Sequence, residues 1–398
     1  MNFKEIIANE IDLNAEQFKA ISTFIGQNPE LGNKEFLAAE QLTTCLSDHG
    51  FTVERGLLGI QTSFLATYDS GKPGPIIAFL CEYDALPQIG HACGHHLICM
   101  MSLGAAVGLK AVLDQTGGII RVYGTPAEET DGAKVPMARE GLFDDCDVAM
   151  MIHPYNRYEQ SGTSLAMNAI TFEFHGRAAH AAASPFEGVN ALDAMIQLFN
   201  GVNALRQQVR SDARIHGIIT NGGQAANIIP DYTSALFYVR AADRPYTNQL
   251  KERVKQVAAG AALQTGCTVT IKEDEFAYDE MRTNSILSSL FNQNLLENGV
   301  EASELHTGKD QGSLDMGNVS LRVPSIHPYI PITSQPYALH TIEFRDAAMT
   351  PYALDQMIFS AKMLAFTACD VLTHPDTLEQ IHQEFEEMIS KQPDGLAQ

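Results

Sequence analysis

The sequence predicts an α/β fold with a mixed, mostly parallel sheet, into which a ferredoxin-like α+β domain is inserted. In the N-terminal part, helix-like and strand-like segments alternate, as they do in parallel sheets covered by helices. Residues 167–275 instead follow the order strand, helix, strand, strand, helix, strand, which is typical of ferredoxin-like domains. Alternation resumes near residue 276. We therefore expect a discontinuous main domain of residues 1–166 and 276–398 and an inserted domain of residues 167–275.

The elements of the main domain follow from apolar periodicity and from short apolar runs. Helical spacing near residues 15–28 and 35–49, and from His95 to Gln115, predicts three helices. Three apolar runs of strand length are typical of buried parallel strands. These runs are Pro75–Cys81, Gly118–Gly124 and Asp147–Ile152.

The inserted domain is predicted from its own strand and helix signals. Its first helix is expected to begin at Pro185, because Ser184 to Glu187 reads as a capping box with proline in the first turn. The second helix is expected over Asn248–Gln264. The four strands are expected over Asn168–Phe174, Arg214–Thr220, Tyr232–Ala241 and Cys267–Lys272.

Composition restricts the classes of partner and compartment. The formal net charge of -22 repels phosphate, so neither nucleic acid nor an anionic membrane is an expected partner, and solubility is the simplest reason for the charge. The N-terminus carries charges and has no apolar signal core. The apolar stretch Leu97–Val112 is short and interrupted, which does not favour a membrane span. Seven sparse cysteines fit a reducing compartment, so we expect a soluble, cytoplasmic protein.

Polar residues that can bind metal ions or transfer protons follow each of the three predicted strands of the main domain. In open α/β sheets, sites form outside the carboxyl ends of the strands. Three separate loops would therefore bring cysteine, histidine and carboxylate side chains to one edge of one sheet. The loops contain Glu82 and Asp84 with His91, Cys93, His95 and His96, then Glu128 with Glu129, and finally His153.

These residue types together are those of a metal site. Thiolate, imidazole and carboxylate ligands suit zinc first, and manganese or cobalt also fit. Alone, the segment from His91 to His96 equally fits a buried cysteine beside helix-capping histidines, and Glu128 with Glu129 alone fits a solvated turn. Two adjacent carboxylates among apolar neighbours repel each other unless a cation is near. The three loops taken together favour metal-dependent hydrolysis.

Several motifs, in one order along nearly the whole chain, resemble a known family. They are EYDALPQIGHACGHH, GTPAEE, MMIHP, GRAAHAAASPFEGVNALDA, GGQAANIIPD, the YVRA strand and a late segment from Ser313 to Ser320. The chain resembles the two-zinc aminoacylase and glutamate carboxypeptidase family of metallopeptidases. Within it, the resemblance is to the amidohydrolase branch that includes hippurate hydrolase and aminobenzoyl-glutamate hydrolase with its dipeptidase relatives. It implies a catalytic domain of the zinc-peptidase type with an inserted lid domain that forms dimers.

The resemblance implies a role for each motif residue. Cys93 is similar to a thiolate that bridges two metal ions, and His95 and His153 resemble ligands of one ion. Glu129 and a late histidine resemble ligands of the other ion, and Glu128 resembles the general base. Two further residues are expected near the ions: Asp84, as a carboxylate that orients a metal-bound histidine, and His91, without a settled role.

Two histidines of the main domain leave alternatives open. His340, in the segment Tyr-Ala-Leu-His-Thr, is the expected late ligand, and His327 is the competitor. His96 stands where Asn or Asp is commoner in the family. Its imidazole could tune the surroundings of the ligands or cap the helix that follows.

The resemblance also assigns residues of the inserted domain. His180 is similar to a histidine that reaches the active site of the other subunit and hydrogen-bonds the scissile carbonyl, and Asn227 resembles a companion donor. Arg240 resembles the guanidinium that receives the substrate carboxylate, for which its forked donors are suited. Without the resemblance, these three would be read as a loop residue, a turn former and a surface charge. A homodimer through the inserted domain is expected.

The predicted activity is hydrolysis of the amide bond of an N-acyl or N-aroyl amino acid, or of a dipeptide, with a free carboxylate. Two divalent metal ions per chain would activate a water, with Glu128 as general base. Three alternatives remain open. The enzyme could be an N-acetyl-diamino-acid deacetylase, the chain could be a non-catalytic metal-binding relative, or the segment from His91 to His96 could hold a structural zinc or redox site.

Overall fold

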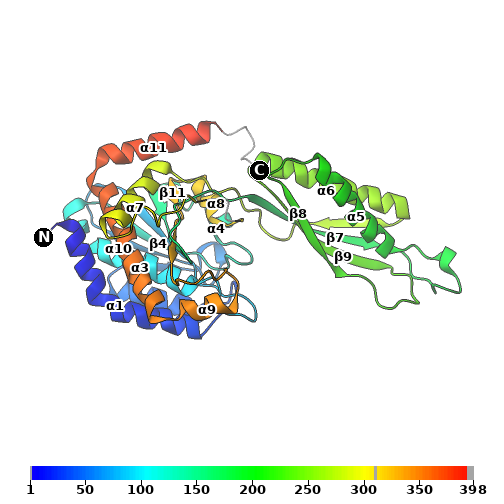
Figure 1. Cartoon of the computed structure of the whole chain (residues 1–398), viewed down its shortest axis with the longest axis horizontal. Coiled ribbons are helices and arrows are strands. Elements are labelled where there is room, and N and C mark those ends of the chain that lie inside the picture. Colours follow the sequence, from blue (N-terminus) through cyan, green and yellow to red (C-terminus); the bar gives the residue numbers. More distant parts are fainter. Residues whose placement is uncertain (1, 309–311, 392–398) are drawn as a thin grey trace. The chain divides into compact units, whose positions relative to one another are not determined.

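A computed structural model describes residues 2–308 and 312–391 and divides the chain into two compact units (Figure 1). The first unit comprises Met1–Thr163 and Met281–Gln392, and Ser164–Glu280 form the second. The second unit extends a few residues beyond the predicted range 167–275, because the backbones of Met167 and Tyr278 pair at its base. The remaining residues of the predicted main domain, 1, 309–311 and 392–398, lie outside the described residues.

The first unit is built on a mixed six-stranded sheet in the order β1-β2-β4-β3-β5-β11. Strands β4, β3, β5 and β11 run parallel, whereas β1 and β2 are joined to them by antiparallel pairing. A two-stranded parallel sheet pairs β6 with β12. The strands are β1 Thr52–Arg55, β2 Phe64–Asp69, β3 Ile76–Cys81, β4 Ile119–Gly124, β5 Val148–Met150, β6 His153–Tyr155, β11 Ser325–Ile326 and β12 Tyr329–Pro331.

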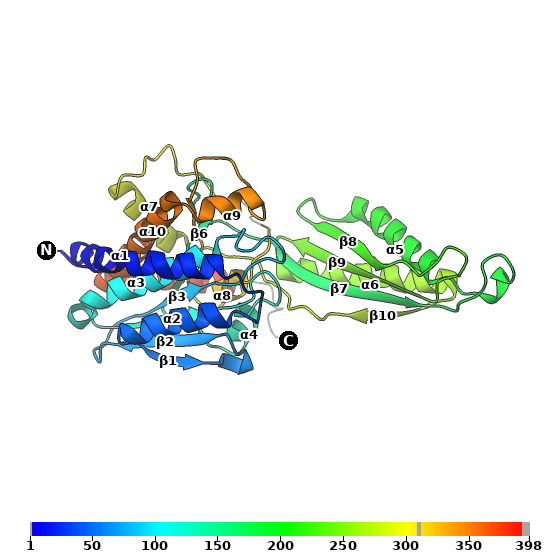
Figure 2. The same cartoon turned by 90° about the horizontal axis from the view of Figure 1, so that it is seen from below.

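Helices cover both faces of this sheet. The alternation along β3 is the reason: Ile77 and Phe79 pack into one apolar cluster, whereas Ala78 and Leu80 pack into another. The first cluster includes α1, α2, α3, α7 and α10, and Figure 2 shows α1 and α3 side by side; the second includes α4 and α8. The helices are α1 Phe3–Gln27, α2 Phe36–Asp48, α3 His95–Thr116, α4 Lys134–Arg139, α7 Ser285–Glu297, α8 Met316–Ser320, α9 Ile342–Ala348, α10 Pro351–Thr373 and α11 Pro375–Ser390, with a 3-10 turn at Leu57–Gly59.

Helix α3 forms the centre of the first unit. It runs for 22 residues and is therefore longer than the apolar stretch Leu97–Val112, so that length and composition alone would allow it to cross a membrane. Within the protein, 89% of its most apolar window is buried. Gly104 and Gly108 permit this packing, since a Cβ on Gly104 would lie 3.1 Å from Ala361, and one on Gly108 would lie 2.5 Å from Ile11. We conclude that α3 is a core helix, and its first turn holds His95 and His96 at the sheet edge.

The second unit has the predicted ferredoxin-like order. Its antiparallel sheet is arranged β10-β7-β9-β8, and α5 and α6 cover the same face (Figure 1). Apolar side chains of both helices and of the inward-facing strand positions form a separate core. The elements are β7 Ala166–His175, α5 Ala191–Leu205, β8 Arg214–Asn221, β9 Tyr232–Ala241, α6 Arg244–Thr265 and β10 Thr268–Lys272, with 3-10 turns at Pro185–Glu187 and Arg206–Gln208.

The predicted start of the first helix of this unit is wrong. Pro185–Glu187 form only a 3-10 turn, without a side-chain cap from Ser184. The backbone after this turn is extended, because Val189 pairs with Arg177 through two backbone hydrogen bonds. Helix α5 begins after this pairing, and the side chain of Asn190 caps it by accepting a hydrogen bond from the Leu192 amide at 3.0 Å.

Candidate metal centre

The three segments predicted from the sequence meet at the carboxyl edge of the sheet in the first unit, but His153 begins strand β6, which pairs with β12, rather than lying in a loop as predicted. The ends of β3 and β4 are tied together, since the Thr125 amide donates to the Cys81 carbonyl at 2.8 Å. Among the described residues, three groups of possible ligand atoms each lie within 4.8 Å of one another. The groups are Cys93 with His95 and His153, Cys93 with Glu129 and His340, and His95 with Glu128 and Glu129.

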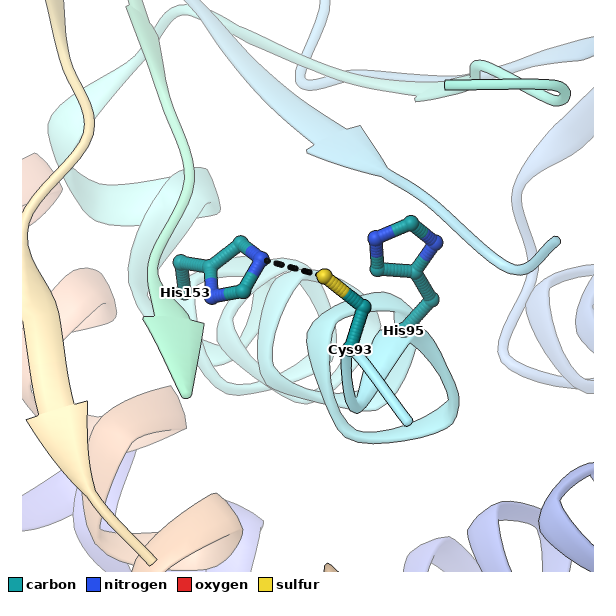
Figure 3. Close-up of side chains that lie close together, drawn as sticks. All are labelled: Cys93, His95 and His153. Atoms are coloured by element: carbon teal, nitrogen blue, oxygen red, sulfur yellow. Dashed lines mark hydrogen bonds between the residues drawn. The ribbon is translucent and has the colours of Figure 1, made fainter. Parts of the chain in front are cut away.

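The first group has imidazoles on either side of the Cys93 thiol (Figure 3). The Nε2 atom of His153 lies 3.5 Å from Cys93 Sγ. Its Nδ1 atom lies 2.7 Å from the Pro154 carbonyl, which can only accept, so the proton sits on Nδ1 and the Nε2 lone pair faces the sulfur. Burial, with His327 nearby, lowers the pKa of His153 to about 3, which keeps its imidazole neutral as metal ligation requires.

The second group shares the same sulfur atom. His340 Nε2 lies 3.4 Å from Cys93 Sγ and 3.1 Å from Glu129 Oε1. The backbone brings this late histidine into place: His340 has a left-handed φ of 64°, and its amide donates to the Ala92 carbonyl at 3.0 Å. Cys93 thus stands between two ligand groups, which is the position required of a bridging ligand.

The competing late histidine lies elsewhere. His327 is buried with its ring centroid 5.6 Å from that of His153, and it belongs to none of the three groups. Burial lowers its pKa to about 4. The geometry therefore favours His340 over His327 as the partner of Cys93 and Glu129.

His91 and His96 are both buried and pack against each other, with ring centroids 5.1 Å apart. Neither belongs to a ligand group among the described residues. The His96 ring does not cap α3; its Nε2 instead donates to the Ala348 carbonyl at the end of α9, at a distance of 3.2 Å. His96 therefore links α3 to the helix that directly follows His340.

Asp84 connects the two ligand groups. Its Oδ1 lies 3.0 Å from Nδ1 of His95, and its Oδ2 accepts from the Glu129 amide at 3.0 Å. The first bond orients the His95 ring so that Nε2 points toward the centre, as carboxylates do for metal-bound histidines. The second bond fixes the backbone of the residue that pairs with His340.

Glu128 lies half-buried beside this centre, in the third group. Burial raises its pKa well above the usual range, and the neighbouring carboxylates of Glu82 and Glu129 raise it further. A carboxyl group with a raised pKa accepts and holds a proton more readily than an exposed one, which is the property expected of a general acid–base group.

A buried charge cluster that the sequence did not reveal lies next to the site. The Lys134 ammonium is 2.6 Å from Glu82 Oε1 and 2.7 Å from Asp315 Oδ1, and all three side chains are essentially inaccessible. Burial alone would raise the pKa of Glu82, but Lys134 lowers it to about 2. The other Glu82 oxygen lies 3.5 Å from His95 Nε2. The motifs containing Glu82 and Asp315 are visible in the sequence, but their pairing through Lys134 is not.

The donor set fits divalent cations. His95 Nε2 is buried and makes no hydrogen bond of normal geometry to any described residue. Burial disfavours a charged His95, yet the Asp84 carboxylate and Cys93 raise its pKa well above the usual range, so its surroundings stabilise positive charge. Burial and Glu129 raise the pKa of Cys93, so a thiolate there needs a cation beside it. A thiolate with imidazole and carboxylate ligands close to it suits zinc or a similar ion.

In the second unit, the structure brings His180 and Asn227 onto adjacent loops. The Ala181 amide donates to the Asn227 carbonyl at 3.0 Å, and His180 pairs with Ile228. His180 is exposed, and its Nδ1 accepts from the amides of Ala182 and Ala183 at 3.2 and 3.1 Å. Its proton therefore sits on Nε2, which remains available to donate to a carbonyl oxygen.

Arg240 lies on β9, on the sheet face that α5 and α6 leave uncovered, together with Leu236 and Tyr238. Its Nε atom is buried without a hydrogen bond, and within the described ranges it has no ion-pair partner. Burial lowers its pKa, and the guanidinium carbon lies 5.8 Å from the Tyr238 ring centroid. A half-buried guanidinium without a carboxylate is suited to receive one from a ligand.

Comparisons with known proteins agree with this arrangement. Residues 165–265 match the family model described as a peptidase dimerisation domain. The chain is 38% identical over 396 residues to a Xaa-Arg dipeptidase of Mus musculus, covering 96% of this chain and 92% of the relative. It is 31% identical to one of the subunits of p-aminobenzoyl-glutamate hydrolase of Escherichia coli (strain K12), covering 97% and 95% of the two chains.

Solved structures share the fold. An aminobenzoyl-glutamate utilization protein from Klebsiella pneumoniae superposes with a TM-score of 0.66 at 20% identity, over 89% of this chain and 96% of that one. A dinuclear metal-binding peptidase of the M20 family from Bacillus subtilis gives a TM-score of 0.66 at 16% identity, over 91% and 99%. The predicted fold class and the predicted resemblance are both confirmed. The chain belongs to the M20 family of metal-dependent peptidases and amidohydrolases.

Proposed function

We propose that this protein is a two-metal dipeptidase that cleaves the amide bond of a dipeptide or N-acyl amino acid with a free carboxylate. The observation that carries the proposal is the position of Cys93 between two ligand groups, with Glu128 beside them. His95 and His153 would hold one ion and Glu129 and His340 the other. Bound divalent ions supply Lewis acidity and lower the pKa of water to near neutrality.

The residues of the chain have separate tasks in this proposal. Glu128 takes a proton from the attacking water and later delivers it to the leaving amine. Asp84 keeps the His95 ring and the Glu129 backbone in place. The His180 Nε2–H and the Asn227 amide donate to the carbonyl oxygen as negative charge develops on it. Arg240 binds the carboxylate.

The names of the relatives suggest which substrates to test first. One relative is named for Xaa-Arg dipeptides and another for aminobenzoyl-glutamate. The net charge of -22 favours the approach of cationic substrates, so we rank Xaa-Arg dipeptides first. Acetylated diamino acids provide the test of the deacetylase alternative.

A homodimer through the second unit is part of the proposal. That unit matches a dimerisation domain, and its sheet ends in the edge strand β8. Ile218 and Ile219 of β8 are 64% and 43% exposed, so this edge presents apolar side chains as well as unpaired backbone groups. A second copy, related by two-fold symmetry, would cover them.

The proposal is tested by an activity screen of the metal-loaded protein over Xaa-Arg dipeptides, other dipeptides, N-aroyl-glutamates and N-acetyl diamino acids. Glu128→Gln should retain the metals and the fold but lose several orders of magnitude in turnover, because the proton acceptor is gone. If Glu128→Gln retains more than about a tenth of the wild-type turnover, a difference of about 1.4 kcal/mol in the barrier, Glu128 is not the base.

Two further variants separate the remaining roles. Cys93→Ala should lower metal occupancy at both positions, whereas Glu129→Gln should lower it at one. A carboxamide analogue of the best substrate should react poorly, because the guanidinium of Arg240 would lose its partner. Equal rates on the free acid and the carboxamide would remove the role given to Arg240.

A further inference from the structure

The segment between α1 and α2 contacts both loops that carry the candidate carboxylates. Leu31 pairs with Ala85, and the Ala85 amide donates to the Glu30 carbonyl at 2.8 Å, next to Asp84. A Cβ on Gly32 would lie 3.0 Å from that of Ala127, immediately before Glu128. This segment is therefore packed closely against the site loops although it contributes no ligand atom among the groups found in the described residues.

Glu35, at the end of this segment, uses its carboxylate to hold that packing together. The side chain is fully buried. Its Oε1 accepts from the amides of Asn33 and Ala127, both at 2.9 Å, and its Oε2 accepts from the Thr62 hydroxyl at 2.8 Å. Every one of these bonds joins the start of α2 to another part of the first unit or to its own turn.

The position of Glu35 makes this use of its carboxylate unusual. Glu35 is the N-cap residue of α2, a position where a short polar side chain ordinarily accepts from the first amides of its own helix, but Glu35 makes no such bond. Glu30 does so instead, since its carboxylate accepts from the amides of Leu37 and Ala38. The Glu35 carboxylate is thereby left to bind the Ala127 loop.

Ala127 needs such a bond because of its backbone conformation. Its φ is 62°, in the left-handed region that a residue with a Cβ adopts only when its surroundings impose it. This turn sets the direction in which Glu128 and Glu129 leave the end of β4. Asn33, the other amide bound by the same oxygen, also has a φ of 62°.

We propose that Glu35 is a positioning residue for the proton-transfer step: by accepting from the Ala127 amide, it holds the left-handed turn that aims Glu128 at the site. The inference rests on the proposed function of Glu128. Displacement of a reacting group by about 1 Å can cost on the order of 100-fold in rate, so the bond matters more for turnover than for substrate binding.

The test compares two variants of Glu35, one that keeps the length of the side chain and one that keeps its carboxyl group. Glu35→Gln keeps the length of the side chain, so its amide oxygen can still accept from Ala127 and its NH₂ can donate to Thr62. Glu35→Asp keeps the carboxyl group but is shorter by one methylene. We expect Glu35→Gln to keep kcat within about threefold and Glu35→Asp to lose about tenfold or more, with KM within about twofold in both.

A second substitution tests the backbone mechanism directly. Glycine adopts positive φ without a steric penalty, so Ala127→Gly should recover at least about threefold of the kcat lost in Glu35→Asp. Alone, Ala127→Gly should leave kcat within about twofold of the wild type. Thr62→Val is the matched control, because it removes only the hydrogen bond to Glu35 Oε2 and leaves the bond from Ala127 to Oε1. It should have less effect on kcat than Glu35→Asp.

Hydrogen exchange gives a readout that does not depend on activity. In the metal-free protein, peptides that cover residues 124–130 should exchange faster in Glu35→Asp than in the wild type or Glu35→Gln. The proposal is overturned if Glu35→Asp keeps its kcat, if Glu35→Gln loses as much as Glu35→Asp, or if the exchange of these peptides does not change. If the wild type hydrolyses none of the screened substrates, the proposed function fails, whereas the exchange result still decides whether Glu35 holds the turn.

Discussion

Removal of the buried Lys134 ammonium is a strong test of the electrostatics beneath the site. In Lys134→Met, Glu82 and Asp315 would lose the cation that lies 2.6 and 2.7 Å away, while their side chains stay inaccessible to water. Loss of one partner from a buried ion pair costs roughly 3–5 kcal/mol, because the other charge is left uncompensated. For a unit of this size that corresponds to a fall of roughly 10 °C in Tm.

The sign of the pH dependence follows from the same pair. In the wild type, Lys134 lowers the pKa of Glu82 to about 2, so the ionised pair contributes stability above the ordinary pKa of 4.5. In the variant, the unpaired carboxylates can become neutral by binding protons. The deficit in unfolding free energy should therefore be largest near pH 8 and should shrink toward pH 5.

The assay is calorimetric unfolding of the metal-free protein between pH 5 and pH 8. Arg322→Met is the matched control, since it breaks an exposed ion pair with Asp144 and should cost less than about 1 kcal/mol at any of these pH values. A Lys134→Met protein as stable as this control, or one with a deficit independent of pH, would refute the reasoning.

Three further predictions concern the site and its partners. Asp84→Asn should weaken metal binding by about 10–100-fold in a competition titration, because an amide oxygen can accept from only one of the two donors that Asp84 now binds. Burial raises the pKa of Glu35 from 4.5 to about 7, so the wild type loses stability as the pH rises through that range. The free energy of unfolding of Glu35→Gln, relative to that of the wild type, should therefore rise by about 3 kcal/mol from pH 4 to pH 8, measured by denaturant unfolding. If His180 acts on the neighbouring subunit, mixed dimers of His180→Ala and Glu128→Gln should regain part of the wild-type activity under subunit exchange; no recovery despite proven exchange would mean that it does not act there.

The sequence was sufficient for the elements that position the site, because those elements have strong local signals. The runs ending at Cys81, Gly124 and Ile152 are apolar enough to indicate buried strands, and the residues that follow them include the metal-binding side-chain types. The pairing of His340 with Cys93 and Glu129 came from the family resemblance. The spacing to the next helix also favours His340 over His327, but only the left-handed turn at His340 shows how the late segment reaches the site.

Interactions between distant segments could not be predicted in this way. Glu35 is one acidic residue before an apolar helix, and nothing near it indicates the Ala127 amide 92 positions later. Lys134 lies in a short apolar helix where a buried lysine has no local explanation. The capping-box pattern from Ser184 to Glu187 predicts a helix start at Pro185, but the strand-like pairing of Val189 delays α5 until Asn190 caps it.

Anomalous diffraction from crystals of the zinc-loaded protein tests the central claim most directly. The account predicts two peaks per chain, about 3.5–4 Å apart, with the Cys93 sulfur between them. One peak should contact His95 and His153, and the other Glu129 and His340. A single peak enclosed by four protein ligands, or no peak at these residues, would contradict the assignment of a two-metal hydrolase.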